Sequence, residues 1–201
     1  NRRYDVLILP SMNKKQILNG NPPGSRPPEY TGGIGDAGAD NLIAFVRRGG
    51  VLICLGNASA FALNRFDLPV KNALADPSDE TPFYCPGSIL QVELDPTHPL
   101  GYGRPSHIGI YFARSPVFSV DNPSVSIARF PGFNPLMSGF LSGHEHIQGK
   151  TALVDAPVEK GRVILFGFRP QHRASRTPPS NSSSTPSSTP PPHPTPPSGD
   201  P

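Results

Sequence analysis

Cys54 lies at the end of an apolar run and two residues before Gly56, in the segment GGVLICLGNAS (residues 49–59). A nucleophilic cysteine or serine in an α/β hydrolase often stands on a sharp strand-to-helix turn, in the pattern G-x-C-x-G or G-x-S-x-G. Backbone N–H groups of that turn stabilise the oxyanion. Leu52 stands where this pattern has its first glycine. The motif for a thiol nucleophile is therefore only partly present.

A thiol nucleophile also needs a neighbouring base to activate it. No histidine near the last predicted strand is followed two residues later by a carboxylate, since His172 precedes Arg173 and Ala174. Buried cysteines in strands are common and inert. We therefore expect no catalytic residue in this chain. If one residue were catalytic, Cys54 would be the candidate. A thiol-dependent amidase or glutaminase that uses Cys54 is the alternative.

Arg169, His172 and Arg173 form a candidate binding site in the segment GFRPQHR, just beyond the last predicted strand. Ligands of α/β sheets bind outside the carboxyl ends of the strands. Arginine is well suited to grip a carboxylate or an acidic partner surface. The alternative is that these side chains pair with local carboxylates such as Asp155 or Glu159.

Two further patterns have structural explanations. Gly33, Gly35 and Gly38 match G-x-G-x-x-G, but a proline-rich loop precedes them where a dinucleotide site requires a strand, so we expect tight turns and helix capping. His144 and His146 offer two ligands, and two ligands do not make a metal site. We expect no metal site and no cofactor in this chain.

The first part of the chain predicts a βαβ unit. YDVLILP (residues 4–10) is a continuous apolar run typical of a buried strand, and Val51–Leu55 is a second one. Between them, residues 20–36 form a long loop and residues 36–48 a helix, with Asp36 as its cap and Gly49 after its end. The right-handed crossover rule makes the two strands parallel and close neighbours. An α/β sheet follows.

The later residues predict more strands and less order. Residues 88–95, 107–113 and 124–130 have strand character, and residues 152–168 predict a hairpin that turns at 159–161. A short helix and an extended segment are expected within residues 61–72. We expect a largely parallel central sheet with irregular insertions between residues 60 and 150.

Composition sets the domain boundary and excludes some partners. The 201 residues have a net charge of +3, no long run of Lys or Arg and no tryptophan, so no nucleic-acid interface is indicated. No apolar run reaches the length of a membrane span. Cys54 and Cys85 form no C-x-x-C motif, so the redox compartment stays open. The chain starts without Met, so we expect a fragment.

Residues 1–173 are expected to form the folded domain, and residues 174–201 a disordered tail rich in Pro, Ser and Thr. One permitted choice of codons for the tail, translated in a neighbouring frame, gives an amphipathic helical sequence. A shifted reading frame at the end of the gene is therefore a second interpretation of the tail.

Several segments together resemble a known family: YDVLILP, PPEYTGGIG, FVRRGGVLICLG, LPVKN, FYCPGSIL, HPLGYG, LMSGFLSG and GRVILFGFRPQHR. This set, in order over residues 4–173, resembles the class I glutamine amidotransferase-like domain at the C-terminus of bacterial zinc carboxypeptidases of the carboxypeptidase A type. The resemblance implies a flavodoxin-like α/β fold with helices on both faces of the sheet. It also implies a covalently linked upstream peptidase domain and a secreted or periplasmic protein.

In that family the peptidase zinc is held by an H-x-x-E pair and a distant histidine. None of the six histidines here belongs to an H-x-x-E motif, so the implied zinc would lie in the missing domain. The expected function is that of a non-catalytic accessory domain of a zinc metallocarboxypeptidase. The alternatives are the thiol-dependent amidase and a ligand-binding module.

Overall fold

The computed structural model describes residues 4–75 and 83–171. His172, Arg173 and the predicted tail 174–201 lie outside these residues. The strands and α-helices follow one another in this order: β1 (Val6–Leu9), α1 (Lys14–Asn19), α2 (Gly35–Arg47), β2 (Val51–Leu55), α3 (Ser59–Arg65), β3 (Val70–Asn72), β4 (Ser88–Leu94), β5 (His107–Phe112), β6 (Phe118–Val120), β7 (Ser126–Arg129), β8 (Leu136–Ser138), β9 (Thr151–Val158) and β10 (Gly161–Phe166). Short 3-10 turns, η1 (Pro28–Tyr30), η2 (Gly56–Ala58), η3 (Pro99–Gly101), η4 (Pro123–Val125) and η5 (His144–His146), join some of them.

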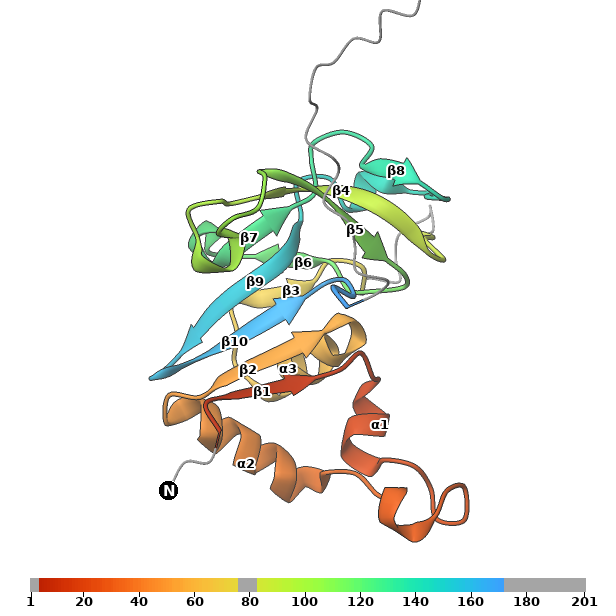
Figure 1. Ribbon diagram of the computed structural model, residues 1–201, viewed down its shortest axis with the longest axis vertical. Coiled ribbons are helices and arrows are strands. Elements are labelled where there is room, and N and C mark those ends of the chain that lie inside the picture. The colour runs from red at the N-terminus through yellow and green to blue at the C-terminus, as the bar shows by residue number, and fades with distance from the viewer. Residues whose placement is uncertain (1–3, 76–82, 172–201) are drawn as a thin grey trace, which may run out of the picture.

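The strands form one mixed sheet in the order β1-β2-β10-β9-β7-β4-β5 (Figure 1). Strand β3 pairs with β6, which also pairs with β9, and β8 pairs with β4. β1 and β10 lie parallel to β2 on either side of it. The βαβ unit predicted from the sequence is thus confirmed, and its two strands are direct neighbours.

The hairpin predicted at residues 152–168 is also confirmed. β9 and β10 pair antiparallel, and Glu159 and Lys160 connect them. The strands predicted at 88–95, 107–113 and 124–130 correspond to β4, β5 and β7, and the short helix and extended segment within residues 61–72 correspond to α3 and β3. The fold class is α/β, with a flavodoxin-like parallel unit at one side of the sheet.

The expectation of a largely parallel sheet is wrong. Only β1, β2 and β10 are parallel among the described residues, and the other pairs are antiparallel. Between residues 60 and 150, where irregular insertions were expected, the short strands β6 and β8 add to the predicted β3, β4, β5 and β7. In β4, buried residues alternate with more exposed ones, so this strand buries one face and pairs along its edges with β5, β7 and β8.

Two apolar cores lie on opposite faces of the sheet. The helix-side core joins α1, α2 and α3 to alternate residues of β2 and β10, such as Leu52 and Leu165. The strand-side core joins Ile53 and Ile164, which point the other way, to β4, β5 and β7. Helices were expected on both faces, but the α-helices of the described residues all pack on the first face. Antiparallel strands cover the second (Figure 1).

The crossover between β1 and β2 contains a helix that the sequence did not predict. The Asn13 side chain caps α1 by accepting a hydrogen bond from the Gln16 N–H at 2.8 Å. Asp36 does not cap α2. It lies in the first turn of that helix and forms an ion pair with Arg65 on α3. Asp36 therefore joins two helices on the same face of the sheet.

Candidate functional site: a pocket at the strand ends

The parallel strands β1, β2 and β10 end side by side, and the residues that follow them are tightly packed. Gly56 follows β2 with a φ of 51°, and a Cβ atom there would lie 2.7 Å from Ser11 Oγ. The backbone N–H of Asn57 donates a hydrogen bond to Ser11 Oγ at 3.3 Å. Glycine is thus required at the turn after β2, both for its backbone conformation and for the space beside Ser11.

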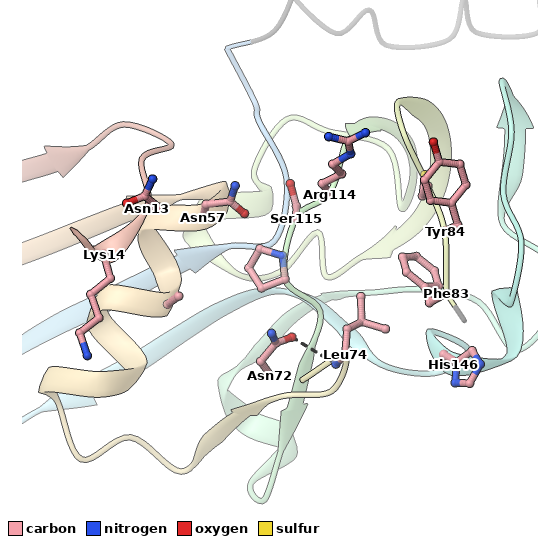
Figure 2. A pocket seen from close by; sticks show the side chains of 13 residues that line it. Asn13, Lys14, Asn57, Asn72, Leu74, Phe83, Tyr84, Arg114, Ser115 and His146 are labelled. Carbon is pink, nitrogen blue, oxygen red and sulfur yellow. Dashed lines mark hydrogen bonds between the residues drawn. The ribbon is translucent and has the colours of Figure 1, made fainter. Parts of the chain in front are cut away.

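A pocket of about 680 Å³ opens beside these turns (Figure 2). Segments far apart in the sequence form its wall: the start of α1, the turn into α3, the residues after β3, the residues before β4 and the residues after β5. Its lining residues are Asn13, Lys14, Asn57, Ala60, Asn72, Leu74, Phe83, Tyr84, Cys85, Arg114, Ser115, Pro116 and His146.

Local hydrogen bonds fix the wall between β3 and β6. The side-chain oxygen Oδ1 of Asn72 accepts hydrogen bonds from the backbone N–H groups of Leu74 at 3.2 Å and Val117 at 3.3 Å. Ser115 is buried, and its hydroxyl donates to the Ala113 carbonyl at 3.2 Å. These bonds set the shape of the pocket before any ligand arrives.

Arg114 adopts a backbone conformation that is rare for a residue with a side chain. Its φ is 46°, and its N–H donates to the Cys85 carbonyl at 3.2 Å. Left-handed conformations at non-glycine residues cost free energy and cluster at functional sites. In Figure 2 the Arg114 side chain stands at the rim of the pocket.

The chemistry of the wall favours a polar ligand. Lys14 and Arg114 supply positive charge, and Asn13 and Asn57 supply amides, whereas none of the lining residues within 4–75 and 83–171 is a carboxylate. Leu74, Phe83 and Pro116 offer apolar surface. A few convergent polar groups on a partly apolar wall are typical of small-molecule sites.

Cys54 is not in this pocket. The residue is 0% exposed in the helix-side core, and burial raises the pKa of its thiol to about 12. Only the thiolate is a nucleophile, so at neutral pH this sulfur is unreactive. The strand holds the thiol away from solvent, because at position 54 the side chain points to the helices.

Cys85, for which no role was expected, lines the pocket. Burial raises the pKa of its thiol, and hydrogen bonds from the Ser88 side chain and the Gly87 backbone oppose that rise. The thiol lies 3.7 Å from the Phe112 carbonyl, to which it donates a hydrogen bond. Of the two cysteines, Cys85 is thus the one nearer to a ligand.

Of the predicted binding residues, only Arg169 lies among the described residues. It follows β10, and its Cγ is 3.6 Å from the position of a Cβ on Gly56. For Arg169, the sequence alternative, a pair with Asp155 or Glu159, is not formed among the described residues. Asp155 binds Arg162 and His98, and Glu159 lies 3.1 Å from Arg47.

The glycines of GGIGDAG have a structural role, as expected. Gly33 packs against the end of α1, where an added Cβ would lie 2.4 Å from the Leu18 carbonyl oxygen, and Gly35 begins α2.

His144 and His146 lie in η5, and His144 pairs with Glu145 at 3.2 Å. Within residues 4–75 and 83–171, no three His, Cys, Asp or Glu side chains gather as metal ligands do. No helix in these ranges combines the length and apolar character that a membrane crossing requires.

No protein-family model matches the chain, and no curated protein matches it significantly. Among solved structures, it is similar to a beta-galactosidase from Bacillus circulans sp. alkalophilus, with 13% identity, 82% of this chain and 20% of that chain covered, and a TM-score of 0.47. It is also similar to a cytoplasmic protein from Salmonella typhimurium (17% identity, 82% and 60% covered, TM-score 0.42). A third is a ThuA-like protein from Bacteroides uniformis (12% identity, 82% and 60% covered, TM-score 0.36). The chain spans less than two thirds of the length of each.

These comparisons correct the family expected from the sequence. The named structures include no carboxypeptidase, and no model of a zinc carboxypeptidase family matches. The upstream peptidase domain, its zinc and its proteolytic activity rested on that resemblance and have no support. Strings such as YDVLILP and GGVLICLG are apolar runs bounded by Pro or Gly, which buried strands of many α/β sheets share.

Proposed function

We propose that this chain is a ligand-binding module that holds a small polar molecule in the pocket at the ends of the parallel strands. The observation that supports it is the wall of the pocket: the described residues that line this space of about 680 Å³ include two cations and several amides and no carboxylate. That space is of the size of small-molecule sites in general.

The burial of Cys54 weighs against the thiol-dependent amidase. Its thiol is enclosed by the helix-side core and stays protonated near neutral pH, because burial raises its pKa to about 12. The module is therefore proposed to bind its ligand without hydrolysing it.

The test is a titration of the uniformly 15N-labelled full chain with glucose, glutamine, malonate and inorganic phosphate. At least one probe is expected to shift the amide signals of Asn57, Leu74, Ser115 and Val117 in a saturable way. Ala60→Phe places a phenyl ring in the pocket from α3 and takes space from the ligand. It should weaken binding at least ten-fold, which corresponds to a loss of about 1.4 kcal/mol of binding free energy.

Ala37→Phe is the matched control, because Ala37 is exposed on α2 and is absent from the pocket wall. It should leave the affinity unchanged. The proposal fails if no probe shifts the pocket signals, or if the two variants weaken binding equally. Ammonia release from glutamine above the blank rate would refute the non-catalytic part.

A further inference from the structure

We propose that the ligand of this pocket carries an oxyanion, a carboxylate or a phosphoryl group, and that Arg169 binds that group where β2 and β10 end. The inference rests on the proposed function, because it names the chemical class of the ligand of the same site.

The first support is the state of the Arg169 side chain. Its Nε atom is buried and has no hydrogen-bond partner among the described residues, while the residue as a whole is only half-buried. A guanidinium has five N–H donors and stays charged in proteins. Removing such a donor from water without a partner costs free energy, and an oxyanion bound by the guanidinium would satisfy it once the side chain turns Nε toward the ligand.

The second support is the place of Arg169 next to the pocket wall. It packs over Gly56, which precedes the lining residue Asn57. On the same segment, Gly167 lies so close to the lining residue Pro116 that an added Cβ would be 2.5 Å from the Pro116 carbonyl oxygen. Arg169 is not itself a lining residue, but its segment touches the pocket wall beside Asn57 and at Pro116.

The third support is the set of donors beside Arg169. Ser11 Oγ accepts a hydrogen bond from Asn57 N–H, which leaves the Ser11 hydroxyl proton available to an anion. Three strand ends thus contribute to one position: Ser11 after β1, Asn57 after β2 and Arg169 after β10. In α/β sheets, ligands bind at the carboxyl ends of the strands.

The carboxylates that the sequence offered as partners do not compete for Arg169. Arg162 and His98 contact Asp155 at 2.8 Å and 3.3 Å, and Arg47 contacts Glu159 at 3.1 Å. Lys14 and Arg114 on the pocket wall add further positive charge. Among the described residues, the charges beside the pocket therefore favour an anionic ligand over a neutral one.

The experiment follows the Arg169 Nε–H and the Ser11 and Asn57 amide signals in 15N spectra of the full chain. Inorganic phosphate and malonate are the probes, at ionic strength held constant with sodium chloride. All three signals should shift saturably. The probe with the lower Kd distinguishes a phosphoryl-binding from a carboxylate-binding site.

Arg169→Gln should raise the Kd of the tighter probe at least ten-fold, the effect expected from losing a charge-assisted contact worth about 1.5 kcal/mol or more. Arg169→Lys keeps the positive charge but loses the planar set of guanidinium donors. Its Kd should lie between those of the wild type and Arg169→Gln. Arg26→Gln is the control, because Arg26 is exposed in the loop before η1. It should change the Kd less than two-fold.

The inference is overturned if neither probe shifts the Arg169 Nε–H signal, if chloride alone reproduces the shift, or if Arg169→Gln keeps the wild-type Kd. If Arg169→Gln does not fold, the inference is tested by the Nε–H shift of the wild type and by the Kd of Arg169→Lys. If glucose or glutamine still binds and Ala60→Phe blocks it, the proposed function survives and only the oxyanion is rejected. If no probe binds, both are rejected.

Discussion

The Arg162 guanidinium grips the Asp155 carboxylate at two points: Nε donates to Oδ1 at 2.9 Å, and Nη2 lies 2.8 Å from Oδ2. The Asp155 side chain is 2% exposed, whereas that of Arg162 is 49% exposed. His98 approaches the same carboxylate, with Nε2 3.3 Å from Oδ2. Because His98 Nδ1 accepts from the Leu100 N–H, the proton of a neutral His98 is on Nε2. This cluster ties the segment between β4 and β5 to β9.

The unequal burial of the two partners predicts unequal costs of removing them. Arg162→Met leaves a buried carboxylate short of its cation, so it should lower the free energy of unfolding by about 3 kcal/mol. Asp155→Asn leaves a half-exposed guanidinium that water can solvate, so it should cost about 1 kcal/mol. Urea denaturation measures both. The exposed pair between Arg47 and Glu159 is the control, since Glu159→Gln should change stability by less than about 0.5 kcal/mol. A larger loss for Asp155→Asn than for Arg162→Met would contradict this explanation.

The two cysteines should differ in their reaction with iodoacetamide. Cys85 lines the pocket, whereas Cys54 is enclosed in the helix-side core with a thiol pKa of about 12. In the native chain at pH 8, Cys85 should be alkylated first and Cys54 only after denaturation. Peptide mass spectrometry over time gives the order, and Cys85→Ser should remove the early modification. Early alkylation of Cys54 would show that its strand is open to solvent.

Cys54 should also make the protein less stable at alkaline pH. Burial raises the pKa of this thiol from 9.0 to about 12. Between these values the unfolded chain loses the proton while the folded chain keeps it. The stabilisation present below pH 9 is therefore lost as the pH rises, at about 1.4 kcal/mol per pH unit. Cys54→Ala should lack this part of the slope in urea denaturation between pH 9 and pH 10.5. Parallel curves for the two proteins would contradict the assigned burial of the thiol.

The β9–β10 hairpin contains a residue whose backbone favours glycine. Glu159 has a φ of 50° and is the first of the two residues between the strands. Glu159→Gly removes the strain of a side chain in this conformation, whereas glycine adds entropy to the unfolded chain. The net effect should be to stabilise the protein by about 0.5 kcal/mol. Lys160→Gly, at a position without positive φ, is the matched control and should destabilise it. Thermal unfolding distinguishes the two, and equal shifts would refute a strained turn.

The parallel unit could be predicted because its signals are local. The apolar runs at Val6–Leu9 and Val51–Leu55 are buried strands, and Gly49 follows the helix between them. Helix α1 escaped prediction because its six residues contain one buried side chain, Ile17. Its cap, Asn13, is the signal that could have found it. The antiparallel pairings of β4 to β8 depend on contacts between distant segments, which the spacing of residues does not determine.

The pocket could be predicted even less. Its wall combines Asn57, Asn72, Ser115 and His146, which come together only because β3 pairs with β6 and β6 with β9. Arg169 was accessible to sequence reasoning, because a strand end in an α/β sheet is a recognisable position. Cys85 was not, since no pattern around it distinguishes a thiol beside a pocket from one inside a core.

Strands β2 and β10 are the common wall of both cores, because their successive side chains point alternately to the helices and to the antiparallel strands. Neither half of the molecule is dispensable as a result. Excising the chain from β4 to β8 would bare Ile53 and Ile164 to water, and deleting the helices would do the same to Leu52 and Leu165. The loops of this protein can therefore vary in length during evolution. The fold cannot be reduced to its parallel unit unless another element buries the exposed apolar face of the sheet.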